Sequence, residues 1–151
     1  MKQKLFYLLV AITSYFAGIL TYLGYLSFIY DEKIGSEWSK FLVWTIPPYL
    51  FIILPYYTLI FRWRRTPLWL RAVMLFGLSI IAAASVPFLI GFGVWRIRDL
   101  FSPELRLFIM FFASSALLFT IGSIVAIKER GYFIFLLASL AIISLAINLL
   151  V

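Results

Sequence analysis

The chain has 151 residues, of which 65% are hydrophobic, 20% aromatic and 13% charged, and its formal net charge is +7. An ordinary soluble domain has about 25% charged residues, so this composition excludes a water-soluble globular protein and makes the bilayer the solvent. In a soluble protein the positive charge would suggest nucleic acid, but no segment is long enough for such a domain. We therefore expect one integral membrane domain, residues 1–151, with no soluble domain and no nucleic-acid partner.

Charged residues divide the chain into five uncharged runs, at 5–30, 41–61, 72–95, 107–127 and 131–151. Each has at least 21 residues, and a helix needs about 20 to cross the hydrocarbon layer. Backbone groups in lipid must pair within their own segment, which favours helices, and the runs lack the alternation of a membrane barrel. The sequence predicts an all-α polytopic membrane protein, an up–down bundle of five transmembrane helices whose short loops make consecutive helices antiparallel neighbours.

The first run follows Met1-Lys2-Gln3-Lys4 and is longer than the apolar part of a signal peptide, about 7–15 residues. We therefore interpret it as a retained first span. On a helix, its small and polar residues share one face at a spacing of three and four residues. That predicted face holds Tyr7, Ala11, Ser14, Tyr15, Gly18, Thr21, Tyr22 and Tyr25.

The second run contains Pro47, Pro48 and Pro55, which predict a kink or a delayed start of the helix. One predicted face of this run holds Thr45, Pro48, Tyr49, Pro55 and Tyr56. Two interpretations of the polar faces stay open. They pack the helices together, or they line a tyrosine-rich cavity between the first two spans that holds an apolar or lipid-like ligand.

The loop at 62–71 carries Arg62, Arg64, Arg65 and Arg71. With the N-terminus inside, the inner segments hold eight Lys and Arg residues and the outer segments five. The positive-inside rule then predicts a multi-pass protein of the cell (inner or plasma) membrane, with a cytoplasmic N-terminus and an outside C-terminus. The same four arginines are candidates for contact with anionic lipid headgroups, at about 1 kcal/mol each.

The last three runs carry fewer signals. Ala113, Ala116, Thr120 and Ser123 repeat at a spacing of three and four residues in the fourth run, which again predicts helix packing. The third and fifth runs show no comparably clear face. We interpret Asn148, near the end of the fifth run, as a group that reaches the interface.

The sequence offers no chemistry that we can assign to a catalytic or metal site. It has no cysteine and no histidine, and its six acidic residues all lie in loops. Proton- and ion-coupled transporters usually keep an ionisable group within the membrane. We interpret the pairs Glu32 with Glu37 and Asp99 with Glu104 as solvated loop charges. We expect no cofactor, no metal ion and no enzymatic activity.

Two functional hypotheses remain, and the residues carry no motif of a family that we recognise. The first is a non-enzymatic protein that acts through membrane partners, as an accessory, regulatory or immunity-type protein. Its partners would be lipids and another membrane protein or further copies of itself. The alternative is a small transporter or a lipid- or apolar-ligand-binding protein that uses the kinked second span.

Overall fold

The computed structural model describes residues 2–62, 66–90, 102–128 and 130–150, and its regular elements are all helical. They are α1 (Lys2–Tyr30), a 3-10 turn (Gly35–Glu37), α2 (Trp38–Pro48), a π-helical turn (Tyr49–Ile53), α3 (Leu54–Arg62), α4 (Leu68–Ile90), α5 (Pro103–Lys128) and α6 (Tyr132–Leu150). The segment from α2 through the π-helical turn to α3 is continuous, and we call it the second span. Five units are long and apolar enough to cross a membrane. The predicted all-α bundle of five helices is confirmed, and its composition indicates a membrane location.

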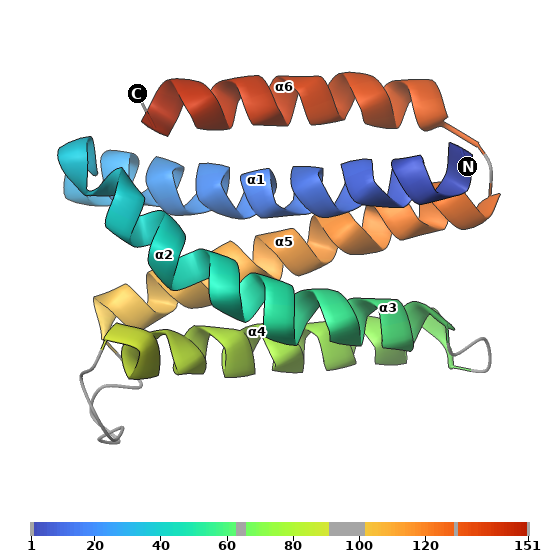
Figure 1. Cartoon of the computed structure of the whole chain (residues 1–151), viewed down its shortest axis with the longest axis horizontal. Coiled ribbons are helices and arrows are strands. Elements are labelled where there is room, and N and C mark those ends of the chain that lie inside the picture. Colours follow the sequence, from blue (N-terminus) through green and yellow to red (C-terminus); the bar gives the residue numbers. More distant parts are fainter. Residues whose placement is uncertain (1, 63–65, 91–101, 129, 151) are drawn as a thin grey trace.

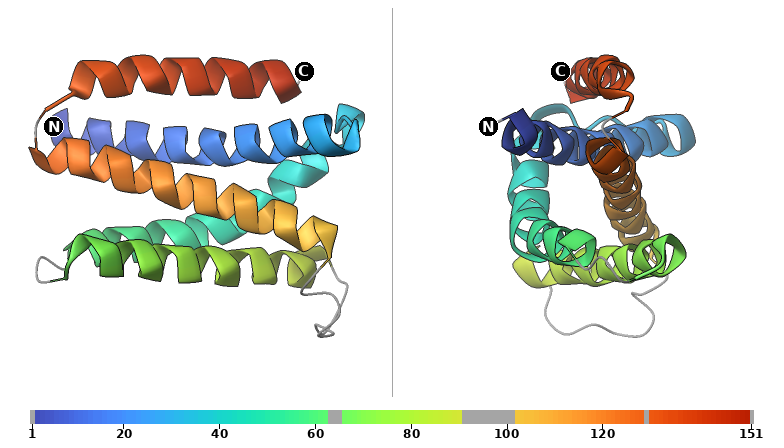
Figure 2. Two further views of the ribbon diagram at one scale, coloured as in Figure 1. Left: turned by 180° about the vertical axis from the view of Figure 1, so that it is seen from behind. Right: turned by 90° about the vertical axis from the view of Figure 1, so that its right-hand side faces the viewer.

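The five spans alternate in direction, so the two chain ends lie at opposite ends of the bundle (Figure 1). The order of neighbours differs from the order in the chain. The most extensive contacts of α1 are with α5 and α6, while α4 packs on α5 and on the second span (Figure 2). Consecutive helices are not always the closest pair: side-chain hydrogen bonds join α1 to the second span, whereas the backbone of α1 lies closer to α5 and α6. Short loops set the direction of a helix but leave its packing partner open.

The closest approach of two helices joins α1 to α5. A Cβ atom added to Gly18 would lie 2.6 Å from Ser115 Oγ and 2.9 Å from the carbonyl oxygen of Phe111. Ser115 Oγ donates a hydrogen bond of 2.7 Å to the carbonyl of Ser14. Small residues that let backbones approach, and hydroxyls that bond across helices, are what holds helices together in lipid.

Helix α5 is the central element because it is buried on two faces. Ser115 and Gly122 face α1, with Val10 packed against Gly122. On another face, the carbonyl of Phe112 accepts a hydrogen bond of 3.1 Å from Ser79 in α4. The ring of Phe119 lies 4.7 Å from the ring of Tyr57 in α3. The core of the bundle therefore surrounds α5.

The second span begins at Trp38, well before Pro47 and Pro48, so a delayed helix start is wrong. The prolines lie in the last turn of α2, and a π-helical turn follows in which Leu54 N–H donates to the carbonyl of Tyr49. Proline lacks an N–H group, and its ring crowds the carbonyl four residues earlier. The wider π turn, which holds one extra residue, accommodates this disruption within a continuous helix.

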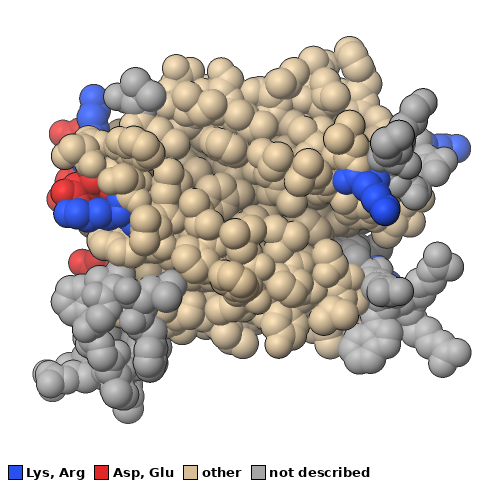
Figure 3. Space-filling model, viewed as in Figure 1, with Lys and Arg blue, Asp and Glu red and all other residues tan. Residues whose placement is uncertain are grey.

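The described charges lie at the two ends of the bundle, with an apolar surface between them (Figure 3). Among the side chains that the structure describes, the end with the N-terminus carries Lys4, Arg71, Lys128 and Arg130 and no carboxylate. The opposite end carries both signs, including an ion pair of 2.7 Å between Lys40 and Glu37. We call the first of these the basic end.

We predict that Gly18→Ala lowers the free energy of unfolding by about 1–3 kcal/mol, because the added methyl group overpacks the contact between α1 and α5. The matched control is Gly24→Ala on the same helix, where an added Cβ meets nothing within 4 Å. Unfolding by SDS in mixed micelles, followed by circular dichroism, measures both variants. Equal stability of the two variants would contradict the close approach.

Candidate functional site at the junction of the first and second spans

Two tyrosines bridge α1 and the second span. The Tyr15 hydroxyl lies 2.7 Å from Thr45 Oγ1, and the Tyr49 hydroxyl donates a bond of 2.7 Å to the carbonyl of Ala11. The Tyr49 hydroxyl also contacts that of Ser14. Thr45 and Ser14 bond in turn to carbonyls of their own helices, at 2.9 and 2.8 Å. The hydroxyls of this cluster are therefore engaged in holding the two spans together.

Aromatic rings surround these hydrogen bonds. The ring of Tyr15 lies 5.1 Å from that of Tyr49 and 5.6 Å from that of Phe111 in α5. Nearer the C-terminal end of α1, the ring centroid of Tyr22 lies 4.6 Å from that of Phe41. Aromatic pairs at such distances contribute about 0.5–1.5 kcal/mol beyond burial. Thr21, also predicted for this face, donates at 2.9 Å to the carbonyl of Ala17 in its own helix.

Tyr56 does not join this interior face. Its side chain is 51% exposed, whereas Tyr57 is fully buried. The expectation for Tyr56 assumed a straight helix of 3.6 residues per turn. The π-helical turn adds one residue, so the buried positions follow in steps of four through Thr45, Tyr49, Ile53 and Tyr57.

An apolar groove lies beside the tyrosine bridge, with a cavity volume of about 280 Å³. We call it the α1 groove. It is lined by Leu8, Ala11, Ile12, Tyr15 and Phe16 from α1 and by Ile46, Tyr49, Leu50 and Leu54 from the second span. The two tyrosines contribute ring surface, because their hydroxyls are bonded between the helices. The groove therefore offers a wholly apolar lining.

The length of the tyrosine side chains explains why a groove forms here. Between α1 and α5, Gly18 lets the backbones come together. Between α1 and the second span, Tyr49 reaches across to the backbone of Ala11, so the two backbones stay further apart. The second span also diverges from α1 toward the basic end and packs on α4 (Figure 1). The wider spacing leaves room for an apolar occupant beside the tyrosine rings.

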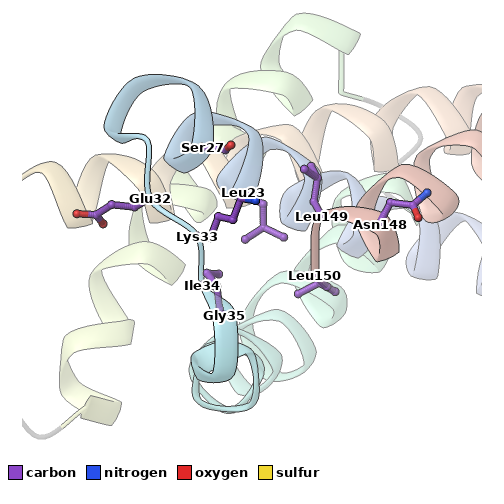
Figure 4. Close-up of a pocket in the computed structure, with 9 residues that line it drawn as sticks. All are labelled: Leu23, Ser27, Glu32, Lys33, Ile34, Gly35, Asn148, Leu149 and Leu150. Carbon is purple, nitrogen blue, oxygen red and sulfur yellow. The ribbon is translucent and has the colours of Figure 1, made fainter.

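A second cavity, of about 170 Å³, lies at the end opposite the basic end. Residues of α1, of the linker before α2 and of the end of α6 line it (Figure 4). Among them, Lys33 extends toward α1, while Glu32 and Asn148 point away from the cavity centre (Figure 4). Asn148 is exposed. This cavity is smaller than the α1 groove, and its charged side chains are exposed to solvent.

The predicted basic cluster is only partly described. Arg64 and Arg65 lie outside the described residues, and the side chain of Arg62 does as well. Arg71 lies in the first turn of α4 at the basic end, where its Nε donates a hydrogen bond of 3.0 Å to Thr66 Oγ1. In the described part of the chain, no three acidic side chains come close enough to share a metal ion.

Sequence reasoning missed three buried residues of this core: Ser79, Ser115 and Tyr57. A signal for Ser79 was present, because Leu75, Ser79, Ala82 and Val86 follow a helical spacing of four, three and four residues. Ser115 was missed because α5 has two buried faces, and the predicted stripe of small residues describes only one. For Tyr57 the π-helical turn leaves no direct mark in the residue spacing.

We predict that Tyr49→Phe lowers the free energy of unfolding by about 0.6–2 kcal/mol, because it removes an interhelical hydrogen bond within the membrane. Tyr56→Phe is the control on the same span, since its side chain is half exposed, and it should leave stability unchanged. SDS titration of both variants measures the difference. Equal effects of the two substitutions would contradict the assigned bridge.

Comparisons with other proteins place this chain in no family. Neither family models, nor curated proteins, nor solved structures gave a match to it. Its function therefore has to be argued from the geometry of the bundle.

Proposed function

We propose that the protein is a non-enzymatic membrane protein that binds an apolar ligand from within the bilayer in the α1 groove. The observation that supports this is the orientation of Tyr15 and Tyr49. Their hydroxyls are bonded between the helices, so their rings face the groove as apolar surface. A site of this kind recognises shape and hydrophobic area and selects against polar solutes, which would lose their own hydrogen bonds there.

We further propose that the protein lies in the cell membrane with its N-terminus in the cytoplasm and its C-terminus outside. The asymmetry of charge between the two ends of the bundle supports this orientation. Lys and Arg are retained on the cytoplasmic side, whereas Asp and Glu contribute little to orientation. The basic end, to which the 62–71 loop also belongs, is then the cytoplasmic end.

A second candidate function, as an accessory protein that acts through a protein partner, is supported by α6. This helix has the highest mean hydropathy of the five spans and the smallest buried share. Its last turn also leaves a hollow against α2, lined by Trp38, Leu42 and Ile147 among others. A helix of a membrane partner would find apolar surface along this outer side.

For the α1 groove, we predict that a lipid-sized adduct accompanies the protein in native mass spectrometry from a mild detergent. Leu50→Trp fills the groove and should reduce the adduct by about tenfold, since each displaced methylene weakens binding by about 0.8 kcal/mol. Leu117→Trp on α5 is the matched control, because Leu117 is exposed and lies outside the groove.

The outcomes of this experiment separate the two candidate functions. Loss of the adduct in Leu50→Trp alone supports ligand binding. A protein subunit that accompanies both variants equally supports the accessory function through α6. Binding in the α1 groove is contradicted if both variants retain the adduct equally. It is also contradicted if the unaltered protein carries no adduct.

For the orientation, we predict that alkaline phosphatase fused to the C-terminus is active and that a fluorescent protein fused there is dark. Replacing Arg62, Arg64, Arg65 and Arg71 by glutamine should reverse this pattern, because the tally of Lys and Arg then becomes four inside and five outside. Replacing Arg96, Arg98 and Arg106 by glutamine should preserve it. A C-terminus that is cytoplasmic in the unaltered protein would refute the orientation.

A further inference from the structure

We infer that the ligand of the α1 groove is an anionic phospholipid of the leaflet at the basic end, with one acyl chain in the groove and its phosphate facing Lys4. This inference rests on the proposed binding of an apolar ligand there. It adds the chemical class of that ligand, the leaflet it comes from and the residue that recognises its headgroup.

The depth of the groove in the membrane supports a lipid from one leaflet. On α1 the groove extends from Leu8 to Phe16, a length of about 12 Å at 1.5 Å per residue. Half of the hydrocarbon layer measures about 15 Å. Because Leu8 lies near the N-terminal end of α1, the groove runs from the basic end to about the middle of the bilayer. This is the space that one acyl chain of that leaflet occupies.

The size of the groove fits a single chain. A cavity of about 150 Å³ holds a benzene molecule of six carbons, so about 280 Å³ accommodates about twice that number. An acyl chain that crosses half of the hydrocarbon layer fills such a volume. A whole transmembrane helix is about 10 Å wide and would fit only by inserting individual side chains.

Lys4 lies above the groove on the same face of α1. The residues Lys4, Leu8, Ile12 and Tyr15 follow each other at steps of four, four and three, so they form one line along the helix. Lys4 is exposed and lies one turn, about 6 Å, beyond Leu8 toward the basic end. A phosphate attached to a chain in the groove would therefore sit next to the Lys4 ammonium group.

The charges of the basic end complement an anionic headgroup. Arg71, Lys128 and Arg130 share this end with Lys4, so even with Glu129 between Lys128 and Arg130 in the sequence its net charge is positive. Basic groups at a membrane surface attract anionic lipids. A chain in the groove and a phosphate at Lys4 together give two contacts with one molecule, so an anionic lipid should bind more tightly than a zwitterionic lipid with the same chains.

The test compares phosphatidylglycerol with phosphatidylcholine of identical acyl chains, each added to the delipidated protein in detergent micelles and followed by native mass spectrometry. The unaltered protein should bind phosphatidylglycerol more tightly than phosphatidylcholine. Lys4→Gln should weaken that binding by about fivefold, the contribution of one basic residue near a charged surface, with little effect on phosphatidylcholine.

Lys128→Gln is the matched control, because it removes the same charge at the same end of the bundle. Lys128 ends α5, beside the corner where Tyr132 of α6 packs on Phe6 at 4.6 Å. Phe6 lies on the side of α1 opposite to Lys4, so this corner faces away from the groove. Lys128→Gln should keep the preference for phosphatidylglycerol.

A second pair of variants tests the acyl chain. Ile12 and Ile121 have similar exposure, 42% and 45%, but only Ile12 lines the groove. Ile12→Trp should reduce the binding of both lipids by about tenfold through loss of about two methylene contacts, and Ile121→Trp should not. Both variants place the added indole on a lipid-facing surface, so their effects on folding should match.

Each result either supports or overturns the inference. Equal binding of the two lipids, or equal effects of Lys4→Gln and Lys128→Gln, overturns the anionic lipid while the proposed function stands if Ile12→Trp still displaces a ligand. Equal binding in Ile12→Trp and Ile121→Trp overturns the inference and the proposed function together.

Discussion

The hydrogen bond from the Tyr49 hydroxyl to the carbonyl of Ala11 is the contact on which the rest of the arrangement depends. It joins the first two spans at a distance set by a tyrosine side chain, whereas Gly18 and Ser115 join α1 and α5 at the distance of two backbones. Within a bilayer a hydroxyl has no water to bond to, and the Tyr49 hydroxyl finds its partners in α1. Helix α1 therefore meets one neighbour closely and the other at a wider spacing, and the α1 groove is the space that this difference leaves.

The prolines and the π-helical turn place the second span so that it makes this contact and still packs elsewhere. Pro47 and Pro48 remove two backbone donors, and the wider turn after them shifts the buried face by one residue. Tyr49, at the start of the π-helical turn, faces α1, and the extra residue then brings Tyr57 to the core beside Phe119 of α5. This local irregularity thus allows the second span to pack against both α1 and α5.

The sequence was sufficient to predict the helical class, the five spans and their alternating direction, because these depend on the length of the apolar runs and on short loops. It also identified the residues that meet between the first two spans, including Ser14, Tyr15, Thr45 and Tyr49. The packing partners were beyond its reach, because helix periodicity shows which face is buried and leaves open which helix covers it. The burial of Tyr57 instead of Tyr56 was unpredictable for a related reason. Helix periodicity assumes 3.6 residues per turn throughout, and the π-helical turn adds a residue that shifts the buried positions after it.

The order of neighbours around α1 has a consequence for the assembly of the bundle during synthesis. Its two main partners, α5 and α6, follow the second span and α4 in the chain, so they are synthesised later. The hydroxyl of Ser14 does not need these later helices as acceptors, because it donates to the carbonyl of Ala11 in its own helix. Over that interval the second span, tied to α1 through Tyr49, is the neighbour that shields its polar face from lipid. The tyrosine bridge is therefore the earlier contact of α1, and the core closes around α1 only after α5 and α6 have been synthesised.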